Sequence, residues 1–269
     1  MPSQFSAIGF HVSSGEDLAA LASQVAERAD TIDAAEGQYL KWAPPSGEQL
    51  WLQVRRNGDA LGMNPHFGGK SVVRAVLEAR VTRPSHTPLD GTFLAWANPP
   101  ADGSPGGDYP FAFDCPDAAT VAGDLPALVT LQVAAFAQQL TVHANEAAFA
   151  ADQAAQGMSF GVHAFIPSGL ISPSGEPVVP PEPHALFSGV VREAEERHNS
   201  VTGEPFWWAL VDTLGGTVDV VIDPTLIQNA VQPGQVVAGW FWLSARVRRP
   251  GDEGAGRGGW FGKLIGRRG

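Results

Sequence analysis

The sequence predicts a mainly β protein. We expect two tandem, related small β-barrel or β-sandwich units, preceded by an N-terminal βαβββ unit and followed by a flexible C-terminal tail. Glycine (31) and proline (22) make up a fifth of the 269 residues, against ~12% in ordinary proteins, so frequent turns and short strands are favoured over long helices. A phrase also recurs 118 residues further along the chain, as NPHFGGKSVVRAVL (64–77) and EPHALFSGVVREAE (182–195).

Residues 1–64 are predicted to form the βαβββ unit. SAIGFHV suits a strand, and the helix that follows has Ser13 or Ser14 as its N-cap, with acidic residues in its first turn. Three further strands are expected in QYLKWAP, EQLWLQV and DALGMNP. The apolar stripe of the helix consists of Leu18, Leu21, Ala22 and Val25.

With His11 late in its first strand, this unit resembles half of a vicinal-oxygen-chelate (glyoxalase-type) module. That resemblance implies a divalent metal held by His and Glu on facing strands. Only one module is present, and Gln53 lies in the strand LWLQV where the Glu ligand is expected. We therefore expect no metal and no cofactor.

The two predicted repeats share an order of strands, turns and prolines. In the first (65–156, with a trailing helix at 144–156), VVRAVLEARV, TFLAWAN, YPFAFDC and ALVTLQVAAFAQQLTVHA are the expected strands. In the second (183–249), the expected strands are VVREAEERHN, PFWWALVD, GTVDVVID and GQVVAGWFWLSARVRR. A strand SFGVHAFI and a Pro-rich connector fill 157–182 between them.

The last strand of the second repeat predicts burial on both faces. Side chains alternate along a strand, and both alternating sets are apolar: Val237, Gly239, Phe241 and Leu243 against Ala238, Trp240, Trp242 and Ser244. We expect a strand that is covered on both sides or bent around a barrel. In strand number and size each repeat resembles an oligonucleotide/oligosaccharide-binding (OB) barrel, which implies a small closed barrel.

The charge of the chain excludes a general nucleic-acid surface. The formal net charge is −11, whereas backbone phosphates demand lysine and arginine. Cys115 is the only cysteine, so no intrachain disulfide is expected. The N-terminus lacks the pattern of a signal peptide, and no apolar run reaches the roughly 20 residues of a membrane span, so we expect a cytoplasmic protein.

The basic end of the chain is the first candidate binding segment. Residues 248–269 carry a net charge of +4, and glycines at 251–259 suggest a flexible tether (250–269 being the tail). The segment WFGKLIGRR places apolar residues beside cations, which suits docking to a protein partner or an anionic membrane surface. The candidate residues are Trp260, Phe261, Lys263, Leu264, Ile265, Arg267 and Arg268.

The function predicted from these patterns is a non-catalytic binding or scaffold protein that contacts a protein partner. The repeated Pro-His and Val-Val-Arg, with His66 and His184 as its histidines, is interpreted as architectural. The alternative hypothesis is a small-molecule or metal-dependent enzyme with a pocket between the N-terminal unit and the first repeat. The residues expected to line that pocket are His11, Trp51, His66 and Arg74.

Overall fold

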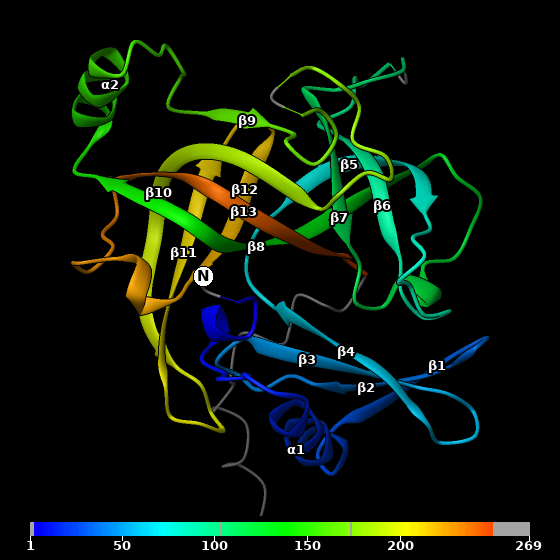
Figure 1. Ribbon diagram of the computed structural model, residues 1–269. Coiled ribbons are helices and arrows are strands. Elements are labelled where there is room, and N and C mark those ends of the chain that lie inside the picture. The colour runs from blue at the N-terminus through cyan, green and yellow to red at the C-terminus, as the bar shows by residue number, and fades with distance from the viewer. Residues whose placement is uncertain (1–2, 103, 173, 250–269) are drawn as a thin grey trace, which may run out of the picture.

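The computed structural model describes residues 3–102, 104–172 and 174–249, and it confirms a mainly β chain. In Figure 1 a four-stranded sheet with one helix lies below a larger, ring-like sheet. The smaller sheet and its helix comprise η1 (Ser6–Ile8), α1 (Gly15–Ala26), β1 (Asp30–Ala34), β2 (Gly37–Trp42), β3 (Glu48–Val54) and β4 (Ala60–Phe67). The remainder comprises β5 (Val73–Val81), β6 (Thr92–Ala97), β7 (Tyr109–Asp114), η2 (Ala118–Thr120), β8 (Ala127–His143), α2 (Glu146–Ala155), β9 (Ala164–Ile166), β10 (His184–His198), β11 (Pro205–Thr213), β12 (Gly216–Ile222), η3 (Pro224–Leu226) and β13 (Val236–Val247).

Helix α1 begins where the sequence predicts. The Ser14 hydroxyl accepts from the Asp17 backbone N–H at 3.1 Å, and the Asp17 carboxylate accepts from the Ser14 N–H at 3.0 Å. These reciprocal bonds satisfy two backbone donors that the first turn leaves without helical partners. The helix buries Leu21 and Val25 against the antiparallel sheet β1–β2–β3–β4.

The expected first strand is wrong: residues 6–8 form a 3-10 turn, and the unit has the order αββββ among the described residues. Side chains satisfy the backbone here in place of a neighbouring strand. The Asn199 amide donates to Ile8 O at 2.7 Å, and the Thr202 hydroxyl donates to Gly9 O at 2.7 Å. The fourth strand is instead β1, a polar and mostly exposed segment that carries no apolar alternation.

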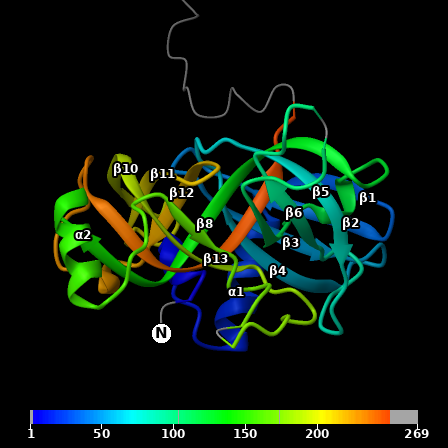
Figure 2. The same ribbon diagram turned by 90° about the horizontal axis from the view of Figure 1, so that it is seen from above.

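The larger sheet closes on itself through two long strands, β8 and β13, which pair with each other in antiparallel fashion. One ring runs β5–β6–β7–β13–β8 and closes where Asp114 pairs in parallel with Ser244. The other runs β10–β11–β12–β8–β13 and closes where β12 pairs in parallel with β8. Figure 2 shows β5 and β6 on one side and β10, β11 and β12 on the other, with β8 and β13 between them.

The two histidines of the repeated phrase occupy different structural positions. His66 lies in β4 and pairs with Gln49 of the small sheet, whereas His184 opens β10 and pairs with Trp242. The 118-residue offset therefore does not place these two residues at matching sites. The relation between the two strand groups stays a prediction.

The two sheets are joined by a buried tyrosine as well as by apolar contacts. The Tyr39 hydroxyl of β2 donates to Leu89 O at 2.5 Å and accepts from the Ala119 N–H at 3.0 Å, and burial raises the pKa of this phenol. Both partners belong to loops of the ring. Among the described residues, none of the helices is long and apolar enough to cross a bilayer.

We predict that Tyr39→Phe lowers the free energy of unfolding by about 1–3 kcal/mol, because Leu89 O and the Ala119 N–H lose their buried partner. Urea denaturation measures the change. Tyr109→Phe is the matched control, since the Tyr109 hydroxyl makes no hydrogen bond within the described residues although its side chain is buried. Equal losses in both variants would contradict the assignment of the stabilisation to this link between the sheets.

Candidate functional site

The structure does not bring the four predicted pocket residues into one cavity. His11 is exposed and lies 3.7 Å from Glu204, while the Arg74 guanidinium donates to Pro99 O at 2.9 Å. Trp51 and His66 are fully buried. The candidate tail residues Trp260, Phe261, Lys263, Leu264, Ile265, Arg267 and Arg268 lie outside the described residues.

His66 is the centre of a buried chain of hydrogen bonds between the sheets. Its Nδ1 lies 2.8 Å from Ser244 Oγ of β13, and its Nε2 lies 2.9 Å from Gln132 Oε1 of β8. The Gln132 amide donates to Asp219 Oδ2 at 2.8 Å. Because the amide nitrogen is used by the carboxylate, Gln132 presents its oxygen to His66, so His66 carries its proton on Nε2 and accepts from Ser244.

This hydroxyl–imidazole contact is structural. A serine–histidine pair is the arrangement that activates a nucleophile, but such a serine must reach a substrate. Ser244 is 1% exposed and His66 is 0% exposed, and an amide stands where a carboxylate would orient the imidazole. Burial, assisted by the charge of Arg246, lowers the pKa of His66 to about 3, which keeps the ring neutral near pH 7.

Asp219 ends the chain and fixes several elements at once. Its buried carboxylate accepts from the backbone N–H groups of Lys70 (2.9 Å) and Ser71 (2.8 Å) and from Trp208 Nε1 (2.9 Å). The carboxylate packs so closely on Gly69 that a Cβ there would lie 2.1 Å from it. Glycine is required at this position because any side chain would displace the carboxylate from its donors.

Beside this network lies a cleft between the small sheet and the ring, with a volume of about 430 Å³. Gln132 and Trp208 line it, together with the glycines of the connector after β4. Five of its lining residues are basic and one, Asp30, is acidic. The basic residues are Lys41, Lys70, Arg197, Arg246 and Arg248.

Four of these cations rest on two indole rings. Lys41 Nζ lies 5.2 Å and the Arg246 guanidinium 4.7 Å from the centroid of Trp51. Lys70 Nζ lies 5.1 Å and the Arg197 guanidinium 4.4 Å from the centroid of Trp208. Such cation–π contacts offset part of the cost of removing the charges from water. We name these groups the Trp51 pair and the Trp208 pair.

The carboxylates that face these cations differ between the two pairs. Arg246 donates twice to the Asp117 carboxylate, at 2.9 and 3.1 Å, and that side chain is 3% exposed. Burial opposes ionisation of Asp117, but Arg246 and hydrogen bonds outweigh it and hold its pKa below the usual value. Lys70 and Arg197 instead pair with Glu193 and Glu195, whose side chains are 46% and 60% exposed.

Arg248 has a different partner. Its guanidinium donates twice to Ser71 O, at 2.9 and 3.2 Å, and no carboxylate of the described residues lies within 4.0 Å of it. In the sequence, Arg248 stands at the start of the basic end of the chain, whereas the structure places it in the wall of the cleft. No sequence motif predicts the site, because its cations come from four separate stretches of the chain between 41 and 248.

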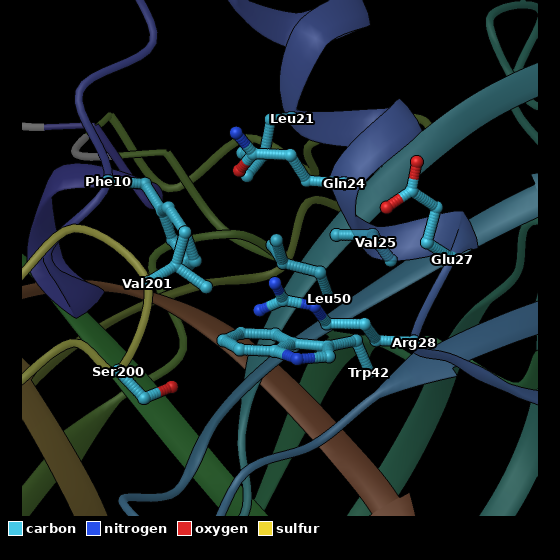
Figure 3. A pocket seen from close by; sticks show the side chains of 10 residues that line it. All are labelled: Phe10, Leu21, Gln24, Val25, Glu27, Arg28, Trp42, Leu50, Ser200 and Val201. Atoms are coloured by element: carbon cyan, nitrogen blue, oxygen red, sulfur yellow. The ribbon is translucent and has the colours of Figure 1, made fainter.

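An open cavity of about 580 Å³ has one acidic and one basic side chain in its lining, Asp33 and Arg56. Two more cavities also have fewer charged side chains than the cleft. The one in Figure 3, about 270 Å³, lies between α1 and the β10–β11 loop. Leu21, Val25 and Leu50 face one another within it, and Glu27 and Arg28 at its rim have opposite charges, so it favours neither sign of ligand. The other, about 280 Å³, is a mostly apolar groove that includes Met158 and Phe160.

Neither a metal cluster nor a relative provides a further assignment. Within the described part of the chain, no three His, Cys, Asp or Glu side chains come together in a way that could hold a metal ion. Comparisons with models of protein families, with curated proteins and with solved structures found no match.

We predict that acid removes the contribution of neutral His66 to stability. In the unfolded chain histidine has a pKa of about 6.5, so between about pH 6.5 and 3 the unfolded state binds the extra proton. The contribution is complete above that window and is lost as the pH falls through it. The free energy of unfolding should therefore fall by up to about 1.4 kcal/mol per pH unit more in the wild type than in His66→Gln.

Urea denaturation at intervals from pH 7 to 4 gives this difference directly. The contributions of acidic groups common to both proteins cancel when the two pH dependences are subtracted. His198→Gln is the control, because His198 is exposed and its loss should leave the wild-type slope unchanged. The same pH slope in the wild type and in His66→Gln would contradict a buried, neutral imidazole.

Proposed function

We propose that this protein is a non-catalytic binding protein and that its ligand is a small anionic molecule held in the basic cleft. One observation carries the proposal. In a chain with a net charge of −11, five of the 17 lysines and arginines line a single cleft that contains one acidic residue. Cations gathered against the general charge of the molecule favour a specific anion.

The physical basis is the position of the cations against two buried aromatic rings, Trp51 and Trp208. Two opposite charges 4 Å apart interact by about 1 kcal/mol in water and by about 4 kcal/mol near a protein surface of effective dielectric constant ~20. The Trp51 and Trp208 rings form such surfaces directly under four of the cations. An anion that enters is therefore attracted more strongly than it would be by the same side chains in solvent.

Binding without catalysis agrees with the composition of the wall. Among the described residues that line the cleft there is no serine, threonine, cysteine or histidine, and the nucleophiles and bases that remain are Lys41, Lys70 and Asp30. The nearby Ser244 and His66 are buried and bonded to each other. The alternative hypothesis, an enzyme pocket between the N-terminal unit and the first repeat, agrees with the position of the cleft. It does not agree with the residues that line the cleft.

We also propose that β5–β8 and β10–β13 are two copies of one OB-like unit. Matching pairings support this: in each group the first strand pairs with the second and the fourth, and the second with the third. The third strand of each group pairs in parallel with the fourth strand of the other. Each first strand also has a bulge against its second strand, at Leu77/Ala79 and at Val191/Glu193.

We predict that the full-length protein binds inorganic pyrophosphate and that Arg248→Gln and Lys41→Gln each weaken binding about tenfold or more. Each substitution removes a charge-assisted contact, typically worth about 1.5–3 kcal/mol. Isothermal titration calorimetry at low ionic strength gives the dissociation constants. Arg192→Gln is the control, because Arg192 is exposed on β10, pairs with Asp212 and does not line the cleft.

Absence of binding by the wild type, or equal weakening by Arg192→Gln, would refute the proposed function. Raising the salt concentration from 50 to 200 mM should weaken binding in the wild type more than in Arg248→Gln, because the variant has one fewer cation to be screened. Thermal unfolding of each variant confirms that the folded protein is being compared.

A further inference from the structure

Four of the five cations of the cleft form two pairs on different indole rings, and this arrangement bears on the ligand that the proposed function requires. The Trp51 pair combines Lys41 of β2 with Arg246 of β13. The Trp208 pair combines Lys70, from the connector after β4, with Arg197 of β10. Each pair therefore offers one ammonium and one guanidinium on its own aromatic support.

The neutral side chain of Gln132 forms part of the cleft wall and is held in place by hydrogen bonds. Its amide is fixed by His66 on one side and by Asp219 on the other. Gln132 also lies directly opposite Arg246 in the pairing of β8 with β13. Trp208 is fixed on the same Asp219 carboxylate through its indole N–H. The positions of the two pairs are thus set by one buried network.

We propose that the cleft binds a small molecule with two phosphate groups, one at the Trp51 pair and one at the Trp208 pair, with its uncharged part across Gln132. A guanidinium presents a planar fork of donors and an ammonium a compact charge, and together they suit the several oxygens of a phosphate better than the two oxygens of a carboxylate. A cleft of about 430 Å³ suits a ligand of small-metabolite size.

The two ends of the cleft differ in how firmly their cations are already engaged. At the Trp51 pair, Arg246 is held by the buried Asp117, so its position does not depend on ligand. At the Trp208 pair, the exposed Glu193 and Glu195 occupy Lys70 and Arg197. A phosphate at this second end competes with two exposed carboxylates, whereas at the first end Arg246 keeps its bonds to the buried Asp117 while the phosphate binds, and Asp30 lies opposite Lys41 in the pairing of β1 with β2. The first phosphate therefore binds at the Trp51 pair, and the second adds affinity at the Trp208 pair.

The test compares a hexose 1,6-bisphosphate with a hexose 6-phosphate by calorimetry on the full-length protein. The bisphosphate is expected to bind at least tenfold more tightly. Lys70→Gln should remove most of that advantage and leave binding of the monophosphate nearly unchanged. Lys41→Gln should weaken binding of both ligands. A linear dicarboxylate of similar length should bind at least tenfold more weakly than the bisphosphate.

A gain-of-affinity variant tests the competition independently. The double substitution Glu193→Gln and Glu195→Gln should strengthen bisphosphate binding severalfold without affecting the monophosphate. Glu196→Gln, combined with Glu204→Gln, is the charge-matched control, since neither residue pairs with a cation of the cleft. In the control variant, the ratio of the dissociation constants of the two ligands should equal the ratio in the wild type.

The outcomes separate this inference from the proposed function on which it rests. Equal affinities for the two phosphates, an equal effect of Lys70→Gln on both, or a dicarboxylate that binds as tightly as the bisphosphate would overturn the two-phosphate inference while anion binding stands. No binding of any of these ligands, or of pyrophosphate, would overturn the proposed function itself.

Discussion

The antiparallel pairing of β8 with β13 is the constraint on which the rest of the structure depends. It extends from Val236 opposite His143 to Val247 opposite Leu131, and both rings of the larger sheet close through it. Close contact between the strands is essential: at Gly239 a Cβ would lie 2.1 Å from Gln139 O. If these strands separated, both rings would open and their apolar interiors would meet water.

The N-terminal unit also packs against these two strands. One face of β13 contributes Phe241 and Leu243 to the ring interior, while Trp242 on the other face packs with the small sheet. Ser244 and Gln132 extend the second face with the polar bonds that hold His66. This arrangement also explains the cleft. Its wall is formed where β8 and β13 extend beyond the part that the small sheet covers.

Much of the strand content could be predicted, because alternation and turn residues are local signals. Both faces of β13 are apolar in sequence and both are covered in the structure, as expected for a strand shared between layers. The turn at 6–8 could not be read, since its backbone is satisfied by Asn199 and Thr202, almost 200 residues away. The polar strand β1 lacks any apolar pattern.

The candidate site was not predictable for a related reason. The sequence predicts His66 and Trp51 as lining of a pocket between the N-terminal unit and the first repeat, but both are buried in the core beneath the cleft. Lys41, Lys70 and Arg197 stand in short stretches that resemble any exposed strand or loop. Only the pairing of β2 with β3 and of β10 with β11, together with the position of the connector after β4, brings them onto two indole rings.

The negative net charge of the chain is compatible with a basic cleft because electrostatic interactions in salt solution extend over only a short distance. Charges in salt at physiological strength are screened beyond about 8 Å, so an anion inside the cleft experiences chiefly the cations of its wall. A long polyanion such as a nucleic acid would extend past the cleft onto a surface where the remaining charge is strongly negative. Five local cations therefore favour a compact anion, and the acidic exterior selects against a polymeric one.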